Sequence, residues 1–181
     1  MRPACPGKRP VGDLAWMPDG KKILFSAPTA QFATEEHYFR LLDLATGEVT
    51  RFPGAEGLHS PRVSPDGSTI AAWVWKGPPW ELALYRFSEA KWRRLRFPDD
   101  TTPTWNSWSH DGESIWYYDW NRHVIMRCHV RENRHEEMVR LTAEEGTGLI
   151  GYWFNLTPSD EPMILLRRDI QQIYALNWKE R

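Results

Sequence analysis

A turn motif recurs at a nearly constant interval along this chain of 181 residues. The turns read MPDG, SPDG, SHDG and TPSD, and a short apolar segment lies on each side of every turn. Aligned on their third residues, the turns lie 47, 45 and 48 residues apart, at Asp19, Asp66, Asp111 and Ser159. A period in the mid-forties, with strand-like segments around a tight turn, is typical of the blades of a β-propeller.

Each repeat contains several short segments with the residue pattern of β-strands. The second repeat supplies PRV, STIAAWVW, ELALYRF and WRRL, and the third supplies NSW, ESIWYYDW, HVIMRCHV and HEEMVRL. Val124, Met126 and Cys128 are expected on one face of their strand, with Arg127 and His129 on the other. No segment keeps the apolar period of an α-helix. The 11 Trp fit strands, and the 14 Pro and 12 Gly separate them.

The predicted fold is all-β, with propeller blades of four antiparallel strands. About four blades are expected, at 11–57, 58–102, 103–148 and 149–181, after an N-terminal extension at 1–10. The last blade is incomplete, because GYWFNL, PMILLRR and QQIYALNW supply only three strands. Residues 1–13 are rich in Pro and Gly, so they are poor material for closing the ring. We expect this chain to be part of a larger propeller, or to form a ring that a partner completes. Edge-to-edge assembly or a homodimer is one such outcome. A truncated gene product is the remaining alternative.

The corner sequence SPDG resembles the corresponding turn of TolB-type, WD40-like propellers. The segment GYWFNLTPSDEPMILLRRDIQQIYALNW is similar to the end of the C-terminal propeller in acidobacterial winged-helix regulators and serine/threonine kinases. The matching positions are Trp153, Phe154, Leu156, Thr157, Pro158, Pro162, Ile173, Tyr174, Ala175, Leu176 and Trp178. Asn155, Ser159 and residues 167–170 depart from the pattern. The resemblance implies a sensing or protein-binding module of a larger signalling protein, and a periplasmic or other extracytoplasmic place. It carries over neither DNA binding nor kinase activity, because those domains are not in this sequence.

Composition narrows the classes of partner. The formal net charge is −1, which gives no electrostatic reason to expect nucleic acid or an anionic membrane. No apolar run is long enough to span a bilayer, and the N-terminus shows no apolar signal-peptide core. The compartment stays open, since a cytoplasmic place is compatible with the missing export signal. Two cysteines, Cys5 and Cys128, exclude a disulfide scaffold.

The Asp-Gly corners are expected to be structural turns. Aspartate accepts hydrogen bonds from turn N–H groups, and glycine adopts positive φ at little cost. Corresponding residues of different blades lie too far apart to share one cation. The predicted turn residues are Asp19, Gly20, Asp66, Gly67, Asp111 and Gly112.

Metal and cofactor sites are not predicted. His123, Cys128, His129 and His135 form the only local cluster of metal-ligand types. Cys128 and His129 are neighbours on a strand and point to opposite faces, so Cys128 is expected in an apolar slot and the histidines in solvent. The chain has no G-x-S-x-G motif, no recognisable Ser/His/Asp set and no glycine-rich phosphate loop. No catalytic residue and no cofactor is therefore predicted.

The tryptophans are the best candidates for a binding surface. Trp80 and Trp120 fall in expected loops, and Trp105 and Trp108 flank an inner strand. Indole rings can anchor a peptide or a sugar, although packing between blades is the competing interpretation for each ring. The leading hypothesis is a non-enzymatic module that binds a protein or peptide. The alternative is a carbohydrate-binding or hydrolytic propeller with an aromatic-lined channel, which requires carboxylates and a histidine to converge.

Overall fold

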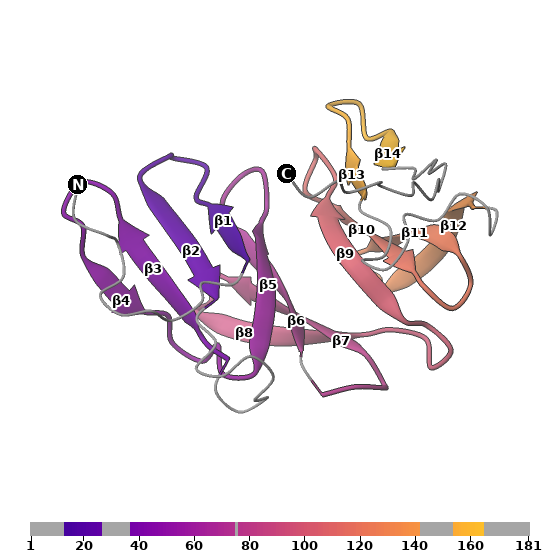
Figure 1. The fold of residues 1–181 in the computed structure, drawn as a ribbon, viewed down its shortest axis with the longest axis horizontal. Helices are drawn as coiled ribbons and strands as arrows, with labels where there is room; N and C mark the ends of the chain where they lie inside the picture. Colours follow the sequence, from indigo (N-terminus) through magenta and orange to yellow (C-terminus); the bar gives the residue numbers. More distant parts are fainter. Residues whose placement is uncertain (1–12, 27–36, 75, 142–153, 165–181) are drawn as a thin grey trace, which may run out of the picture.

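The computed structural model describes residues 13–26, 37–74, 76–141 and 154–164. These residues contain strands and no helix, and none of them forms a helix that could cross a membrane (Figure 1). The first sheet comprises β1 (Leu14–Trp16), β2 (Lys22–Ser26), β3 (Phe39–Asp43) and β4 (Val49–Arg51). The second comprises β5 (Leu58–Val63), β6 (Thr69–Val74), β7 (Glu81–Arg86) and β8 (Lys91–Arg96). The third comprises β9 (Pro103–Trp108), β10 (Ser114–Asp119), β11 (Val124–His129) and β12 (Arg134–Arg140), and β13 (Phe154–Leu156) pairs with β14 (Pro162–Ile164).

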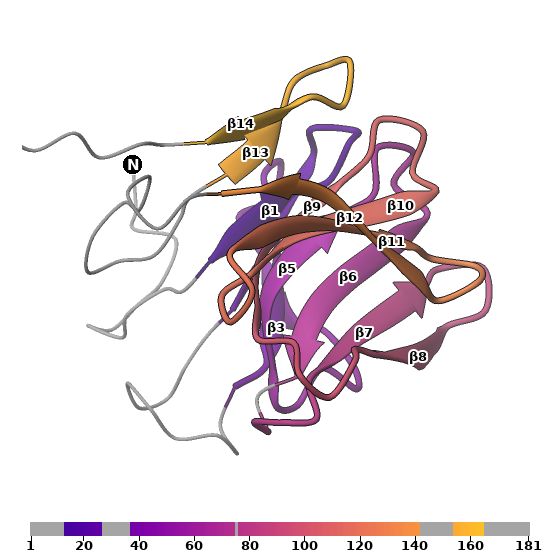
Figure 2. The ribbon, with the colours of Figure 1, turned by 90° about the vertical axis from the view of Figure 1, so that its right-hand side faces the viewer.

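Every sheet is an antiparallel meander, as predicted for propeller blades. The strand orders are β1-β2-β3-β4, β5-β6-β7-β8 and β9-β10-β11-β12. The innermost strands contact one another in sequence order, β1 with β5, β5 with β9 and β9 with β13. Figure 2 shows the third sheet nearer the viewer and the second sheet behind it. The described sheets do not close into a ring, and the strand expected at QQIYALNW lies outside the described residues.

The hydrophobic core lies between the blades. All six residues of β6 are buried, because a neighbouring sheet covers each of its faces. Ile70, Ala72 and Val74 pack in the cluster shared with the first blade. Ala71 and Trp73, on the other face, pack in the cluster shared with the third blade. A third cluster joins β10 and β11 to β13 and β14.

The first strand of the first blade exposes two large apolar side chains. Ala15 pairs with Leu24, which packs toward the second blade, whereas Leu14 and Trp16 point the other way. These two side chains are 52% and 56% exposed. These exposed side chains agree with an arc that a further blade would continue, and that further blade stays a prediction.

Successive corners pack against one another. Gly67 has φ of +73°, and a Cβ added there would lie 3.2 Å from the ring of Pro18 in the preceding turn. A Cβ on Gly112 would likewise approach Pro65 at 3.8 Å. Glycine in these turns therefore has two roles: it adopts the positive φ of the turn, and its lack of a side chain leaves room for the proline of the preceding blade.

The substitution Gly67→Ala is expected to lower the free energy of unfolding by about 2 kcal/mol, through backbone strain and overpacking together. Gly20→Ala is the matched control, because φ is +68° there and no atom lies within 4 Å of the added Cβ. It should cost only about 1 kcal/mol. Urea unfolding of both variants measures the difference, and equal losses would show that the contact with Pro18 contributes nothing.

Candidate functional site

The aspartates of the corners bond within their own turns. Asp66 Oδ1 accepts hydrogen bonds from the Ser64 hydroxyl at 2.6 Å and the Ser68 N–H at 3.0 Å. Ser64 Oγ in turn accepts from the Thr69 N–H at 2.9 Å. These hydrogen bonds, that from Ser64 foremost, lower the pKa of Asp66 to about 2. The equivalent set in the third blade is Ser109, Asp111, Glu113 and Ser114. In the first blade, Asp19 Oδ1 accepts from the Lys21 N–H at 2.9 Å.

The degenerate fourth turn uses a threonine for the same task. Thr157 Oγ1 accepts hydrogen bonds from the N–H groups of Ser159, at 3.3 Å, and Glu161, at 3.0 Å. Asp160 Oδ1 accepts from the His110 N–H at 2.8 Å and so links the fourth turn to the third. The corner carboxylates thus serve separate turns and do not converge on one ligand.

Two of the four candidate tryptophans are packed in the fold. The Trp108 side chain is only 9% exposed, and its indole N–H donates to the carbonyl of Arg62 at 3.1 Å, from β9 to β5. Trp80 is half-buried against the core cluster between the second and third blades. The side chain of Trp105 lies outside the described residues. The ring of Trp108 therefore serves packing between blades rather than a surface.

Trp120 is exposed, on the loop between β10 and β11. Its side chain is 41% exposed, whereas its backbone N–H donates to the Thr102 carbonyl at 2.9 Å. The fully buried Asp119 accepts at Oδ1 from the N–H groups of Thr102 and Asn121, both at 3.1 Å. The Asn121 side chain also donates to the Asp100 carbonyl at 3.1 Å. These bonds hold the loop against its neighbour, so the indole is presented from a fixed backbone.

The far end of the same loop is fixed as well. His123 Nδ1 and the Tyr118 hydroxyl are 2.8 Å apart, and the His123 carbonyl accepts from the Leu141 N–H at 2.8 Å. The rings of Tyr118 and Trp120 meet edge to face at 6.2 Å. Sequence reasoning singled out Trp120 but missed this support, whose only visible signal is the aromatic and polar content of YYDWNRH.

The structure brings Cys128 and His135 together, with Sγ 3.7 Å from Nε2, whereas His123 and His129 contact other residues. Burial raises the pKa of the Cys128 thiol to about 12, so the thiol is protonated at neutral pH. His135 Nδ1 lies 3.0 Å from the Tyr117 hydroxyl. His129 Nε2 lies 2.8 Å from a Glu136 oxygen. The expectation of simply solvated histidines was wrong, because neighbouring strands supply partners. In the described segments, no group of three or more His, Cys, Asp or Glu residues could hold a metal ion.

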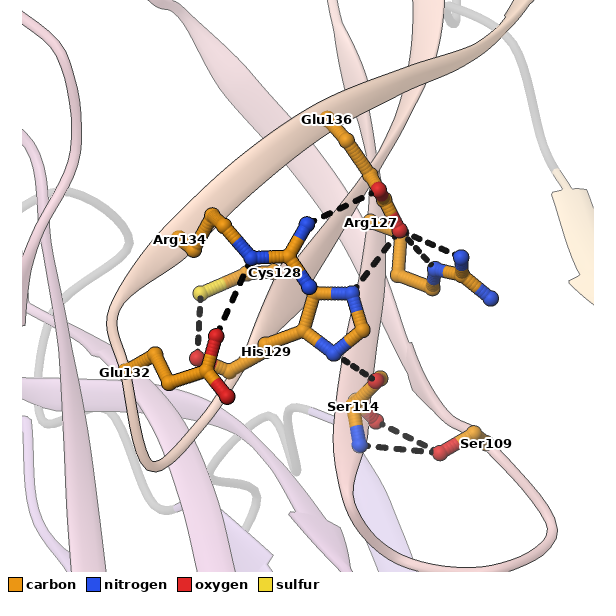
Figure 3. Close-up of polar contacts among 8 residues, drawn as sticks. All are labelled: Ser109, Ser114, Arg127, Cys128, His129, Glu132, Arg134 and Glu136. Atoms are coloured by element: carbon orange, nitrogen blue, oxygen red, sulfur yellow. Dashed lines mark hydrogen bonds and ion pairs between the residues drawn. The ribbon is translucent and has the colours of Figure 1, made fainter.

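Glu136 is the centre of a charged network on the outer strands of the third blade (Figure 3). Its carboxylate contacts Arg127, His129 and, at 3.0 Å, Arg134. The hydrogen bonds from His129 and Arg127 lower the pKa of Glu136 to about 2. The network neutralises its own charges near the surface, where such pairs add little stability. It offers neither a free nucleophile nor an uncompensated charge.

The inner strands bring together a serine, a histidine and an aspartate. The Ser60 hydroxyl donates to Asp13, and His59 Nδ1 lies 3.1 Å from the same hydroxyl. In a hydrolase triad the histidine lies between the other two and accepts the serine proton. Here the serine lies in the middle and its proton points to the carboxylate, so this set is not arranged for nucleophilic catalysis. Ser60 has φ of +51° within a β-bulge, which re-aims this part of β5.

Asn106 adds a polar group to the junction of the second and third blades. Its side chain is 5% exposed, and neither Nδ2 nor Oδ1 has a hydrogen-bond partner among the described residues. A buried amide of this kind is expected to bond water. The inner strands are therefore polar at several points, without a set of converging carboxylates.

Comparisons with known proteins identify the fold. No protein-family model matches the sequence, and no curated protein matches it either. The TolB structure from Acinetobacter baumannii is similar with a TM-score of 0.65 and 19% identity, over 91% of this chain and 39% of that one. A TolB structure from Agrobacterium tumefaciens is similar with a TM-score of 0.65 and 16% identity, over 89% of this chain and 60% of that one. The β-propeller domain of Cps50 (Swd1) from Myceliophteria thermophila is similar with a TM-score of 0.56 and 14% identity, over 86% of this chain and 48% of that one.

The chain therefore spans less than two thirds of each of these structures. At such identities the likeness concerns the fold and not the activity. The narrower resemblance to the propellers of winged-helix regulators and kinases stays a prediction. The fold is that of a TolB-like β-propeller, as the sequence predicted.

Proposed function

We propose that this chain is a non-enzymatic propeller module that binds a protein or peptide through the loops at one end of its blades. The observation that carries the proposal is the exposed indole of Trp120 on a loop whose backbone is held by Asp119, Thr102 and Asn121. A large aromatic side chain on a fixed backbone loses little conformational entropy when a partner covers it. Tryptophans of this kind dominate the binding energy of many protein interfaces.

The family resemblance also suggests the kind of protein and the compartment in which the module works. We propose that the module works within a larger signalling or regulatory protein, outside the cytoplasm. The TolB-like fold supports the general role, since propeller blades present loops from every repeat at the same end. The alternative of a hydrolytic or carbohydrate-binding propeller is less well supported, because the corner carboxylates bond within separate turns and Ser60 lies between His59 and Asp13.

A library of displayed random peptides tests the proposal. Peptides selected on the wild-type chain are expected to bind Trp120→Ala at least about tenfold more weakly, as for a central aromatic anchor. Phe87→Ala is the matched control, because Phe87 is 40% exposed but follows β7, near the opposite ends of the strands. Enriched peptides that bind both variants like the wild type would overturn the assignment to the Trp120 loop, and an unenriched library would overturn peptide binding itself.

A further inference from the structure

The outer strand of the second blade carries a row of positive charge in which, among the described residues, only Arg96 has a carboxylate partner. Four of the six residues of β8 are Lys or Arg, and none is acidic. Arg96 lies 3.6 Å from Glu81, and the Arg93 side chain donates to the Val130 carbonyl at 3.0 Å. Within the described part of the chain, the side chains of Lys91 and Arg94 have no carboxylate partner.

The equivalent strand of the third blade is different. On β12, Arg134 bonds Glu132 and Glu136, both at 3.0 Å, and Arg140 bonds Glu137 at 2.7 Å. The two strands occupy the same place in their sheets, as the last of four. Carboxylates therefore neutralise the arginines of β12, whereas most of the positive charge of β8 has no carboxylate partner among the described residues.

The backbone of β8 also has an open side. β8 is an edge strand that pairs only with β7, so the N–H and C=O groups of alternate residues point away from the sheet. The Phe97 N–H donates to the Trp80 carbonyl on the β7 side. Because hydrogen-bonded pairs alternate along the strand, the backbone groups of the odd-numbered residues of β8 face β7. Trp92, Arg94 and Arg96 therefore present their backbone groups outward. The Arg96 carbonyl is bonded by the Asn133 side chain at 3.2 Å, which limits the open stretch to the first part of the strand.

A groove of about 330 Å³ lies beside this open stretch. It is lined by Leu84, Arg86, Glu89, Lys91, Trp92 and Arg93. Its one acidic residue, Glu89, pairs with Arg86 at 3.1 Å, so Lys91 and Arg93 give the groove its net positive charge. The half-buried Trp92 supplies apolar contact area, whereas Leu84 is 2% exposed and only closes the floor of the groove. Groove and edge together can accept side chains as well as backbone.

We propose that the β8 edge binds an extended, acidic segment of a partner protein, which adds to the second blade as a further strand. Side chains two residues apart on a strand are about 6.6 Å apart, so acidic residues on an added strand match the spacing of Lys91 and Arg93 on one face. The segment meets Arg94 on the other face. Main-chain hydrogen bonds supply affinity and the cations supply selectivity. This surface is separate from the Trp120 loop and does not depend on it.

Fluorescence anisotropy with a labelled peptide of alternating glutamate and valine tests the proposal. The variant Lys91→Glu/Arg94→Glu should weaken binding by on the order of tenfold or more. Lys21→Glu/Lys76→Glu is the matched control: both residues are exposed, both lie outside β8, and the net charge changes equally. The control and Trp120→Ala should both keep the wild-type affinity. A glutamine–valine peptide should bind far more weakly.

N-methylation of the peptide separates strand addition from simple charge attraction. Only alternate N–H groups of an added strand face β8, so methylation of one alternate set should abolish binding while methylation of the other set is tolerated. Equal affinity of the two methylated peptides would refute strand addition. Failure of the unmodified peptide to bind would mean that the basic row only prevents edge pairing, a common role of Lys and Arg on edge strands. Equal binding of a single-stranded oligonucleotide would overturn the acidic-peptide assignment.

Discussion

Trp108→Ala is expected to lower the free energy of unfolding by about 3–5 kcal/mol, the usual cost of truncating a buried tryptophan. The ring is 9% exposed and belongs to the core cluster between the second and third blades. The substitution also leaves the Arg62 carbonyl without its indole donor, which is 3.1 Å away in the wild type. Urea unfolding, followed by circular dichroism, measures the loss.

Two further variants separate the contributions to that loss. Trp108→Phe keeps an aromatic ring but removes the N–H donor, so a loss of about 1–3 kcal/mol is expected from the unsatisfied carbonyl and the smaller ring. Trp120→Ala is the control for tryptophan removal as such, because that side chain is 41% exposed. It should cost less than about 1 kcal/mol. Similar losses at positions 108 and 120 would contradict the division of the two rings into packing and surface.

The blades were predictable because their signals are local. A corner such as SPDG encodes its own turn: Ser64 and Asp66 bond backbone N–H groups within five residues, and Gly67 adopts positive φ. Strand alternation then assigned faces correctly, as with the buried Cys128 beside the half-buried His129. Repetition of these local signals at one period was enough to predict an array of sheets.

The contacts between blades were not predictable in the same way. Trp108 contacts Arg62, and Pro18 contacts Gly67, across about one full repeat. The residues around each position do not indicate which residue of the next blade it contacts. Sequence spacing also treats Trp108 and Trp120 alike, although one is packed and the other exposed. Which ring is covered depends on the neighbouring blade.

The bonding of polar side chains was the least predictable feature. His59 and Ser60 are adjacent in sequence, but Asp13, which accepts a hydrogen bond from the Ser60 hydroxyl, lies just before the first strand of the first blade. The bulge at Ser60 turns its side chain away from strict alternation. The sequence shows that a serine, a histidine and an aspartate are present. Which of them bonds which decides the chemistry of the set, and this depends on the path of the backbone.

Acid is expected to destabilise the fold between pH 6.5 and about 4, largely through His59. Burial and the nearby His37 lower the pKa of His59 from 6.5 to about 4, against a weaker opposing effect of Asp13. Below pH 6.5 the unfolded chain binds a proton at this histidine that the folded chain does not bind. Stability is therefore full above pH 6.5 and falls as the pH is lowered toward 4, by up to about 3 kcal/mol. Urea unfolding at intervals between pH 7.5 and 4.5 (roughly the range in which histidines titrate) measures the slope.

His59→Gln should flatten most of this slope, because glutamine does not titrate. A smaller slope should remain, since burial also lowers the pKa of His135. His110→Gln, at an exposed position, is the control for a histidine-to-glutamine substitution as such. Asp66 and Glu136, each with a pKa of about 2, lose their stabilising charge mainly below the ordinary carboxyl range, so they do not account for a loss that starts at pH 6.5. An unaltered slope in His59→Gln would show that a different group binds the proton, and a stability that rises on acidification would contradict the buried neutral imidazole altogether.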